Sequence, residues 1–167
     1  MPERKTIEKA KQDKRQGKSA STQAGEFVKE QIHHVREGRH GVRSTKQAIA
    51  IGLSEARRSG VDLPAPKHGR ASAKTRAKAE QDVRKGDETP HKKSATRSRA
   101  TKTALKREGK SGASKSALAA HAKTAAKRRS AADRSAAAKK AARTKGAAGR
   151  SAAAKKAART RAANRHA

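Results

Sequence analysis

The chain has 167 residues, but its composition differs from that of one folded domain of this length, because 38 residues are Ala and only 15 are Val, Ile, Leu, Met or Phe. Twelve of these 15 residues precede Pro64, so a packed core is expected only in the N-terminal part. The formal net charge of +31 favours a polyanionic partner, and the absence of cysteine excludes a disulfide scaffold and a Cys-based zinc site.

Residues 1–20 are expected to form a charged, marginal helix. Pro2 suits a first helical position, Gly17 suits a stop, and Ile7 is the only large apolar residue between them. Without an apolar stripe this helix is expected to fray. The charged start lacks the apolar run of a secretory signal, and no window has the roughly 20 apolar residues of a membrane span. These features predict a soluble, cytoplasmic protein.

Residues 21–63 are expected to form a helical-pair module. The first helix is predicted over residues 22–37, capped by Ser21 or Thr22 and closed by Gly38. The second is predicted over residues 45–59, where Ser44 and Gln47 have capping-box spacing. The short linker predicts an antiparallel pair. Its small core is predicted from the apolar spacing to contain Phe27, Val28, Ile32, Val35, Val42, Ile49, Leu53 and Val61.

Beyond Pro64 the chain is expected to be an intrinsically disordered basic tail. Residues 64–113 read as a basic linker with helix-prone segments, and residues 114–167 as a low-complexity Ala/Lys/Arg tail. An 11-residue sequence repeat, Arg-Ser-Ala-Ala-Ala-Lys-Lys-Ala-Ala-Arg-Thr, occurs at residues 134–144 and again at 150–160. The predicted fold class is therefore mostly α or disordered, with a small N-terminal helical hairpin and a long tail that folds only on contact with a polyanion.

The charge is concentrated in this tail, since residues 67–167 carry 31 basic and 6 acidic groups. This predicts binding to nucleic acid, with DNA favoured over RNA, by non-sequence-specific phosphate neutralisation, as in a nucleoid-associated or architectural protein. With one Phe and no Tyr or Trp, base stacking is not expected. The candidate binding residues are Lys127, Arg128, Arg129, Arg134, Lys139, Lys140, Arg143, Lys145, Arg150, Lys155, Lys156, Arg159 and Arg161.

No catalytic arrangement of Ser, His and Asp is visible, so we expect no enzyme, no small-molecule substrate and no cofactor. His33, His34 and His40 have no accompanying Cys or evident carboxylate set, so surface histidines are expected in place of a metal site. Two alternatives stay open: an RNA- or ribosome-associated protein, and a protein-interaction adaptor whose tail only localises it. The sequence leaves the oligomeric state open.

Two resemblances come from these residues. The stretch Ser-Thr-Lys-Gln-Ala-Ile-Ala-Ile-Gly-Leu-Ser-Glu-Ala-Arg-Arg at residues 44–58 resembles the signature of a family of small basic bacterial proteins with an uncharacterised domain, most specifically between Lys46 and Arg57. This resemblance implies a bacterial cytoplasmic protein and no particular chemistry. The Ala/Lys/Arg tail is similar in composition to linker-histone and bacterial histone-like tails, although the strands of a winged-helix domain are not evident.

Overall fold

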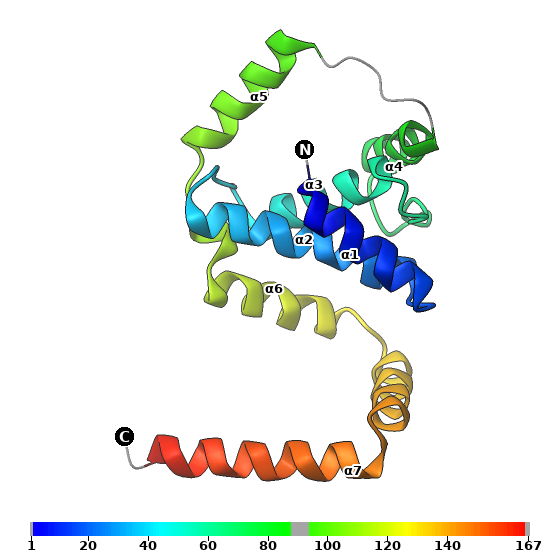
Figure 1. Cartoon of the computed structure of the whole chain (residues 1–167), viewed down its shortest axis with the longest axis vertical. Coiled ribbons are helices and arrows are strands. Elements are labelled where there is room, and N and C mark those ends of the chain that lie inside the picture. The colour runs from blue at the N-terminus through cyan, green and yellow to red at the C-terminus, as the bar shows by residue number, and fades with distance from the viewer. Residues whose placement is uncertain (1, 88–93, 166–167) are drawn as a thin grey trace. The chain divides into compact units, whose positions relative to one another are not determined.

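The computed structural model describes residues 2–87 and 94–165, and 78% of these residues are helical. Contacts divide the chain into two compact units, one ending at His121 and the other beginning at Ala122. The helices, drawn in Figure 1, are α1 (Arg4–Arg15), α2 (Ala20–Glu37), α3 (Thr45–Arg58), α4 (Ala73–Asp87), α5 (Ala95–Arg107), the short 3-10 helix η1 (Ser111–Ala113), α6 (Lys115–Lys127) and α7 (Ala131–Arg165).

The predicted helical pair is present as α2 and α3. Ser19, two residues earlier than the predicted cap, begins α2, and its hydroxyl accepts the Thr22 N–H at 3.4 Å. The expected Ser44 cap begins α3 and accepts the Gln47 N–H at 3.3 Å. Gly38 ends α2 with φ of 82°, in the left-handed region that glycine adopts without steric cost.

The two helices pack antiparallel through small residues. Phe27 shares a core cluster with Ala56, while Val35, two turns further along α2, shares another with Ala48 near the start of α3. Between these clusters the helix backbones come close at Gly52, where a Cβ atom would lie 2.7 Å from Val28 Cα. The face of α3 that turns inward therefore carries Ala and Gly in place of large apolar side chains.

This packing changes the role of several predicted core residues. Four of the predicted core residues are buried: Phe27, Val35, Val42 and Val61. The other four are half-buried: Val28, Ile32, Ile49 and Leu53. Ile32 and Leu53 pack against the buried clusters from their edges. The buried positions between them belong to Ala24, Ala48 and Ala56, which are not among the large apolar residues of the predicted core.

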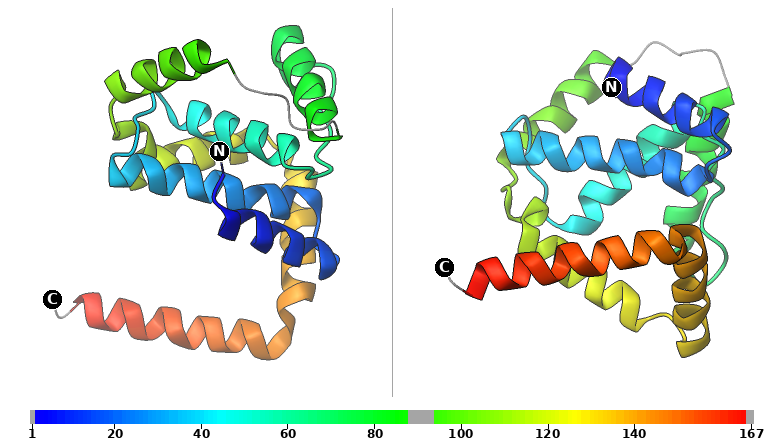
Figure 2. Two further views of the ribbon diagram at one scale, coloured as in Figure 1. Left: turned by 45° about the horizontal axis from the view of Figure 1, so that its top comes forward. Right: turned by 60° about the horizontal axis from the view of Figure 1, so that its bottom comes forward.

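The charged N-terminal helix α1 runs alongside α2 (Figure 2). Ala10 is buried in the cluster around Phe27, and Ile7 packs against it. Asp13 is buried as well, and its Oδ1 accepts from the Lys18 ammonium at 2.7 Å. The predicted N-terminal helix is present, and one apolar edge and a buried carboxylate pack it against the helical pair.

The packed unit continues beyond Pro64. The helix α4 packs against α3, and at Gly86 a Cβ atom would lie 2.2 Å from the Arg57 carbonyl oxygen. The buried Asp82 faces Arg58 Nε at 3.5 Å. At the other end of α3, η1 places Ala113 in the core, and the Thr45 hydroxyl donates to the Gly112 carbonyl at 2.6 Å.

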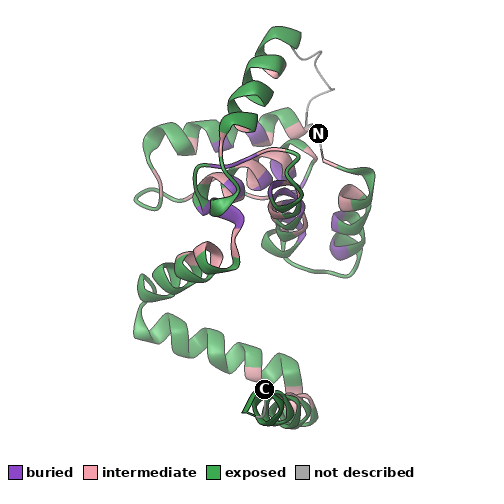
Figure 3. Cartoon of the chain, turned by 90° about the vertical axis from the view of Figure 1, so that its left-hand side faces the viewer, coloured by how far each residue is buried: buried purple, intermediate pink, exposed green. Residues whose placement is uncertain are grey.

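The prediction of an intrinsically disordered tail is wrong. In Figure 3 buried residues lie in the first unit, yet the exposed segment from residue 131 to residue 165 is also helical. An α-helix satisfies its own backbone hydrogen bonds, so a segment rich in Ala does not need a core to become regular. Serine hydroxyls also cap three of these helices: Ser94 begins α5, Ser114 begins α6 and Ser130 begins α7.

Candidate functional site

Among the described helices, α7 carries the largest number of Lys and Arg residues, and a single glycine divides it into two segments. Gly146 has φ of 67° and ψ of 172°, a backbone conformation that essentially only glycine adopts. The segments before and after it, residues 131–145 and 147–165, are about 22 Å and 28 Å long at 1.5 Å per residue. Each segment contains one copy of the 11-residue repeat.

The two copies have the same local structure. The Thr144 hydroxyl donates to the Lys140 carbonyl at 3.0 Å, and the Thr160 hydroxyl donates to the Lys156 carbonyl at 3.1 Å. The Arg150 guanidinium also reaches back across the glycine and donates to the Ala142 carbonyl at 2.8 Å. The repeat in the sequence is thus a repeat in three dimensions, with one cationic pattern shown twice.

All thirteen predicted nucleic-acid-binding residues are exposed. Lys127 ends α6, Arg128 and Arg129 lie in the turn that follows, and the other ten lie on α7. The structure groups them by segment: the first half of α7 carries Arg134, Lys139, Lys140, Arg143 and Lys145, and the second half carries Arg150, Lys155, Lys156, Arg159 and Arg161.

Within one segment the cations form two groups around the helix. At about 100° per residue, Lys139, Lys140 and Arg143 fall within an arc of roughly 100°, and Arg134 and Lys145 lie together on the opposite side. The residues between them are Ala, Ser and Thr, whose small side chains keep the diameter of the helix small. From residue 131 to residue 165 there are eleven basic residues and one acid, Asp133. No residue of α7 is buried, so its charged groups face solvent.

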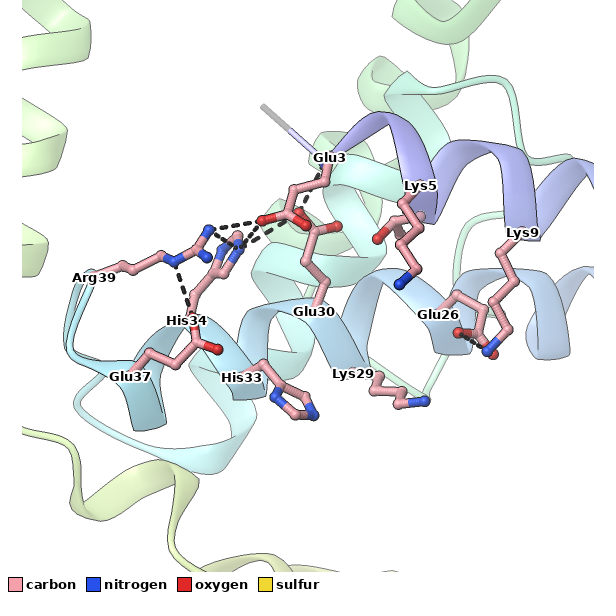
Figure 4. A pocket seen from close by; sticks show the side chains of 11 residues that line it. Glu3, Lys5, Lys9, Glu26, Lys29, Glu30, His33, His34, Glu37 and Arg39 are labelled. Atoms are coloured by element: carbon pink, nitrogen blue, oxygen red, sulfur yellow. Dashed lines mark hydrogen bonds and ion pairs between the residues drawn. The ribbon is translucent and has the colours of Figure 1, made fainter.

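A different site lies in the first unit, where the start of α1 meets the C-terminal half of α2 (Figure 4). Glu3 precedes α1, and its backbone N–H donates to Glu30 Oε1 at 2.8 Å. His34 Nε2 lies 3.1 Å from Glu3 Oε1 and 3.7 Å from Glu30 Oε1. The Arg39 guanidinium lies 2.7 Å from Glu3 Oε1. The hydrogen bonds from His34 and then from Arg39 hold the pKa of Glu3 below its usual range.

This carboxylate and imidazole cluster was missed at the sequence level. His33 is exposed on the outer face of α2, and His40 bonds Gln31 at 3.0 Å, so of the three histidines only His34 meets carboxylates. The available signal was the spacing of Glu30 and His34, four residues apart on one helix face. Glu3 could not be assigned to them without knowing how α1 packs.

The N-terminal part of the first unit is similar to a known family. Residues 3–68 match the family of unknown function DUF6496. The match contains α1 to α3 and ends before α4 and the Ala/Lys/Arg-rich segment, so the expected likeness of that segment to histone tails has no support. No curated protein and no solved structure matches the chain. Among the described residues, no helix is both long and apolar enough to cross a bilayer.

Proposed function

We propose that the chain is a non-enzymatic DNA-binding protein in which α7 neutralises phosphates without reading base sequence. The observation that carries the proposal is the exposure of every Lys and Arg in α7, whose two helical segments together contain a single acid, Asp133. Each phosphate contact releases condensed counterions, so affinity comes mainly from charge. With no aromatic residue in α7 to stack on bases, sequence preference is expected to be weak.

The helical form of α7 favours duplex DNA over duplex RNA. The major groove of B-DNA is about 12 Å wide and admits an α-helix, whereas the major groove of A-form RNA is deep and narrow. The small residues of α7 let its backbone approach the groove floor while the cations extend to the phosphates on either side. A nucleoid-associated or architectural role is the form of this proposal that fits binding without sequence preference.

The test is a titration of labelled duplex DNA by fluorescence anisotropy at several salt concentrations. If about ten cations engage together, the slope of log affinity against log salt is expected to be roughly −9. Replacing six residues of α7 with Gln is expected to make the slope shallower by up to about 5 units, and by the same amount on unrelated sequences. The six residues are Lys139, Lys140, Arg143, Lys155, Lys156 and Arg159.

A control with an equal loss of charge separates α7 from bulk electrostatics. The control replaces six exposed cations of the first unit with Gln: Lys5, Lys11, Lys14, Arg15, Lys29 and Lys46. It is expected to retain most of the wild-type slope. If both variants lose affinity equally, the chain binds only through its total charge and the assignment to α7 is wrong. A tighter complex with duplex RNA of matched sequence would instead favour an RNA-associated protein.

A further inference from the structure

Glu3, Glu30 and His34 bring three metal-ligating groups together at the contact between α1 and α2. One ligand atom from each residue lies within 4.8 Å of the other two. Glu30 and His34 project from the same face of α2, and Glu3 is held beside them by its backbone hydrogen bond to Glu30. We propose that these three residues bind a divalent transition-metal ion, with Zn²⁺ as the best-fitting ion.

The distances between the ligand atoms suit such an ion. Zn²⁺ binds imidazole nitrogen and carboxylate oxygen at about 2.0–2.2 Å, which in a tetrahedral site separates neighbouring ligand atoms by roughly 3.4 Å. The Nε2 atom of His34 lies 3.1 Å from Glu3 Oε1 and 3.7 Å from Glu30 Oε1, on either side of that value. Small side-chain rotations therefore complete the protein's share of the coordination.

The burial of Glu30 is an independent indication of a ligand. Its side chain is only 5% exposed, and its Oε2 atom has no hydrogen-bond partner among the described residues. A buried carboxylate oxygen without a partner is costly, and a bound cation removes that cost. Figure 4 shows this carboxylate directed toward Glu3 and His34.

A second indication is the conflict around His34 Nε2. The Arg39 guanidinium lies 3.0 Å from this nitrogen and 2.7 Å from Glu3 Oε1. One ring nitrogen cannot accept from Arg39 and donate to Glu3 at the same time. A metal ion resolves the conflict, because the nitrogen lone pair and both carboxylates can face it. Arg39 retains a second partner, Glu37, at 3.0 Å.

The ligand types select the class of metal. Mg²⁺ and Ca²⁺ prefer sites built from oxygen alone, whereas an imidazole beside carboxylates suits Zn²⁺ and its first-row neighbours. Two carboxylates balance the charge of a divalent ion. Three protein ligands leave a position for water, since the pocket beside them is open to solvent.

The test is calorimetric titration of the full chain with Zn²⁺ and, in parallel, with Mg²⁺. The wild type is expected to bind Zn²⁺ in preference to Mg²⁺, and bound Co²⁺ is expected to give the visible absorption of a low-symmetry site. His34→Gln and Glu30→Gln are expected to weaken Zn²⁺ binding by more than about 100-fold, beyond the 10- to 100-fold typical of outer-shell residues.

Two further variants make the test specific. His33→Gln removes the neighbouring exposed histidine and is expected to leave Zn²⁺ affinity unchanged. Arg39→Gln removes the competing guanidinium and is expected to raise the affinity. If Zn²⁺ binding survives His34→Gln, or falls as far with His33→Gln, other histidines bind the ion and the proposed site is wrong.

Folding is monitored separately by circular dichroism. A ligand bound only by the folded state at 100 times its Kd raises the ratio of folded to unfolded protein about 100-fold, so Zn²⁺ is expected to raise the Tm of the wild type but not of His34→Gln. If Glu30→Gln does not fold, the half-buried His34 decides the question alone. No Tm shift in the wild type would mean that Glu3, Glu30 and His34 form an ion-pair network without a metal.

Discussion

The two units of this chain are helical for different reasons. In the first unit the helices α1 to α4 depend on one another, through the clusters around Phe27 and Val35 and through buried polar groups such as Asp82. In the second unit no residue among those described is buried, and the helix rests on alanine propensity and on the Ser130 cap. Helix formation therefore depends on packing in the first unit and on local helix propensity in the second.

The distribution of charge follows the same division. In the first unit acids and bases pair across elements, as Lys9 does with Glu26 at 3.0 Å and Arg58 with Asp82 at 3.5 Å. From residue 122 onward fifteen Lys and Arg residues accompany one acid, Asp133. Some charges of the first unit therefore hold its own helices together, whereas the second unit has almost no acid to pair with its cations.

The largest effect is expected from Phe27→Ala. Phe27 is fully buried, and truncation of a buried Phe typically costs about 3–5 kcal/mol, which is a large share of the stability of a small core. Hydrogen exchange measured by mass spectrometry is expected to show lost protection across α1 to α3. The exchange of α7 is expected to stay unchanged; faster exchange there would mean that the second unit depends on the first.

A smaller effect is expected from Gly52→Ala. The added Cβ meets the backbone of α2 at Val28, and overpacking of this kind costs about 1–3 kcal/mol, partly offset by a helix-propensity gain of up to about 1 kcal/mol. Gly25→Ala is the matched control, since a Cβ at Gly25 in α2 meets nothing within 4 Å among the described residues. Urea unfolding is expected to show that Gly52→Ala is destabilised and Gly25→Ala stabilised. Equal shifts in both variants would contradict the close helix contact.

Gly146→Ala is expected to reduce DNA affinity by about tenfold, or about 1.4 kcal/mol. Alanine disfavours the backbone conformation of Gly146, so the helix is expected to continue through this position. The two copies of the repeat begin 16 residues apart, and at about 100° per residue the second copy would be rotated roughly 160° from the first. The larger cation groups of the two copies would then lie on nearly opposite sides of one continuous helix. Anisotropy is expected to show a shallower salt slope. Gly149→Ala, which stays inside a helix, is the control, and an equal loss in both variants would argue against this role of Gly146.

The smallest effect is expected from Glu55→Gln. Burial is the main cause that raises the pKa of Glu55, although the Gln31 amide donates to its carboxylate at 2.6 Å. A raised pKa in the folded state means that the favourable contribution of this carboxyl is complete below its ordinary value of 4.5 and is lost as the pH rises through the folded pKa. The Tm advantage of Glu55→Gln over wild type is therefore expected to grow from pH 4 to pH 7. The exposed Glu80→Gln serves as control, and a pH-independent advantage would refute the burial argument.

The local signals in the sequence were sufficient for the α2–α3 pair. The Ser44 cap, the Gly38 stop and the apolar spacing of residues 28, 32 and 35 are local patterns along the chain, so they could be interpreted without tertiary information. Of that apolar stripe only Val35 is fully buried, together with Phe27 beside it. The inward face of α3 could not be found in this way. Its buried positions are Ala48, Gly52 and Ala56, and small residues become core only when another backbone approaches them.

The disordered tail was predicted wrongly because burial was taken as the condition for order. That condition applies to helices that must pack, but α7 lacks large apolar side chains that would require cover. The Glu3, Glu30 and His34 cluster was missed because it depends on a tertiary contact. Glu3 is 27 positions from Glu30 and 31 positions from His34 in the sequence. The cationic residues of α7 could be selected from charge alone, but their two-segment arrangement depends on the backbone of Gly146.

The docking of η1 on the helical pair has a consequence for synthesis of the protein. Arg36 Nε donates to the Ala113 carbonyl at 2.9 Å, a contact between residues 77 positions apart in the sequence. The Thr45 hydroxyl donates to the Gly112 carbonyl, 67 positions away. At about 5–20 residues per second, the ribosome supplies η1 several seconds after the start of α3. The helical pair is therefore expected to emerge with the end that contains Val42 and Ala48 uncovered. Ala113 closes it last, which leaves an interval in which a chaperone can bind that end of the nascent chain.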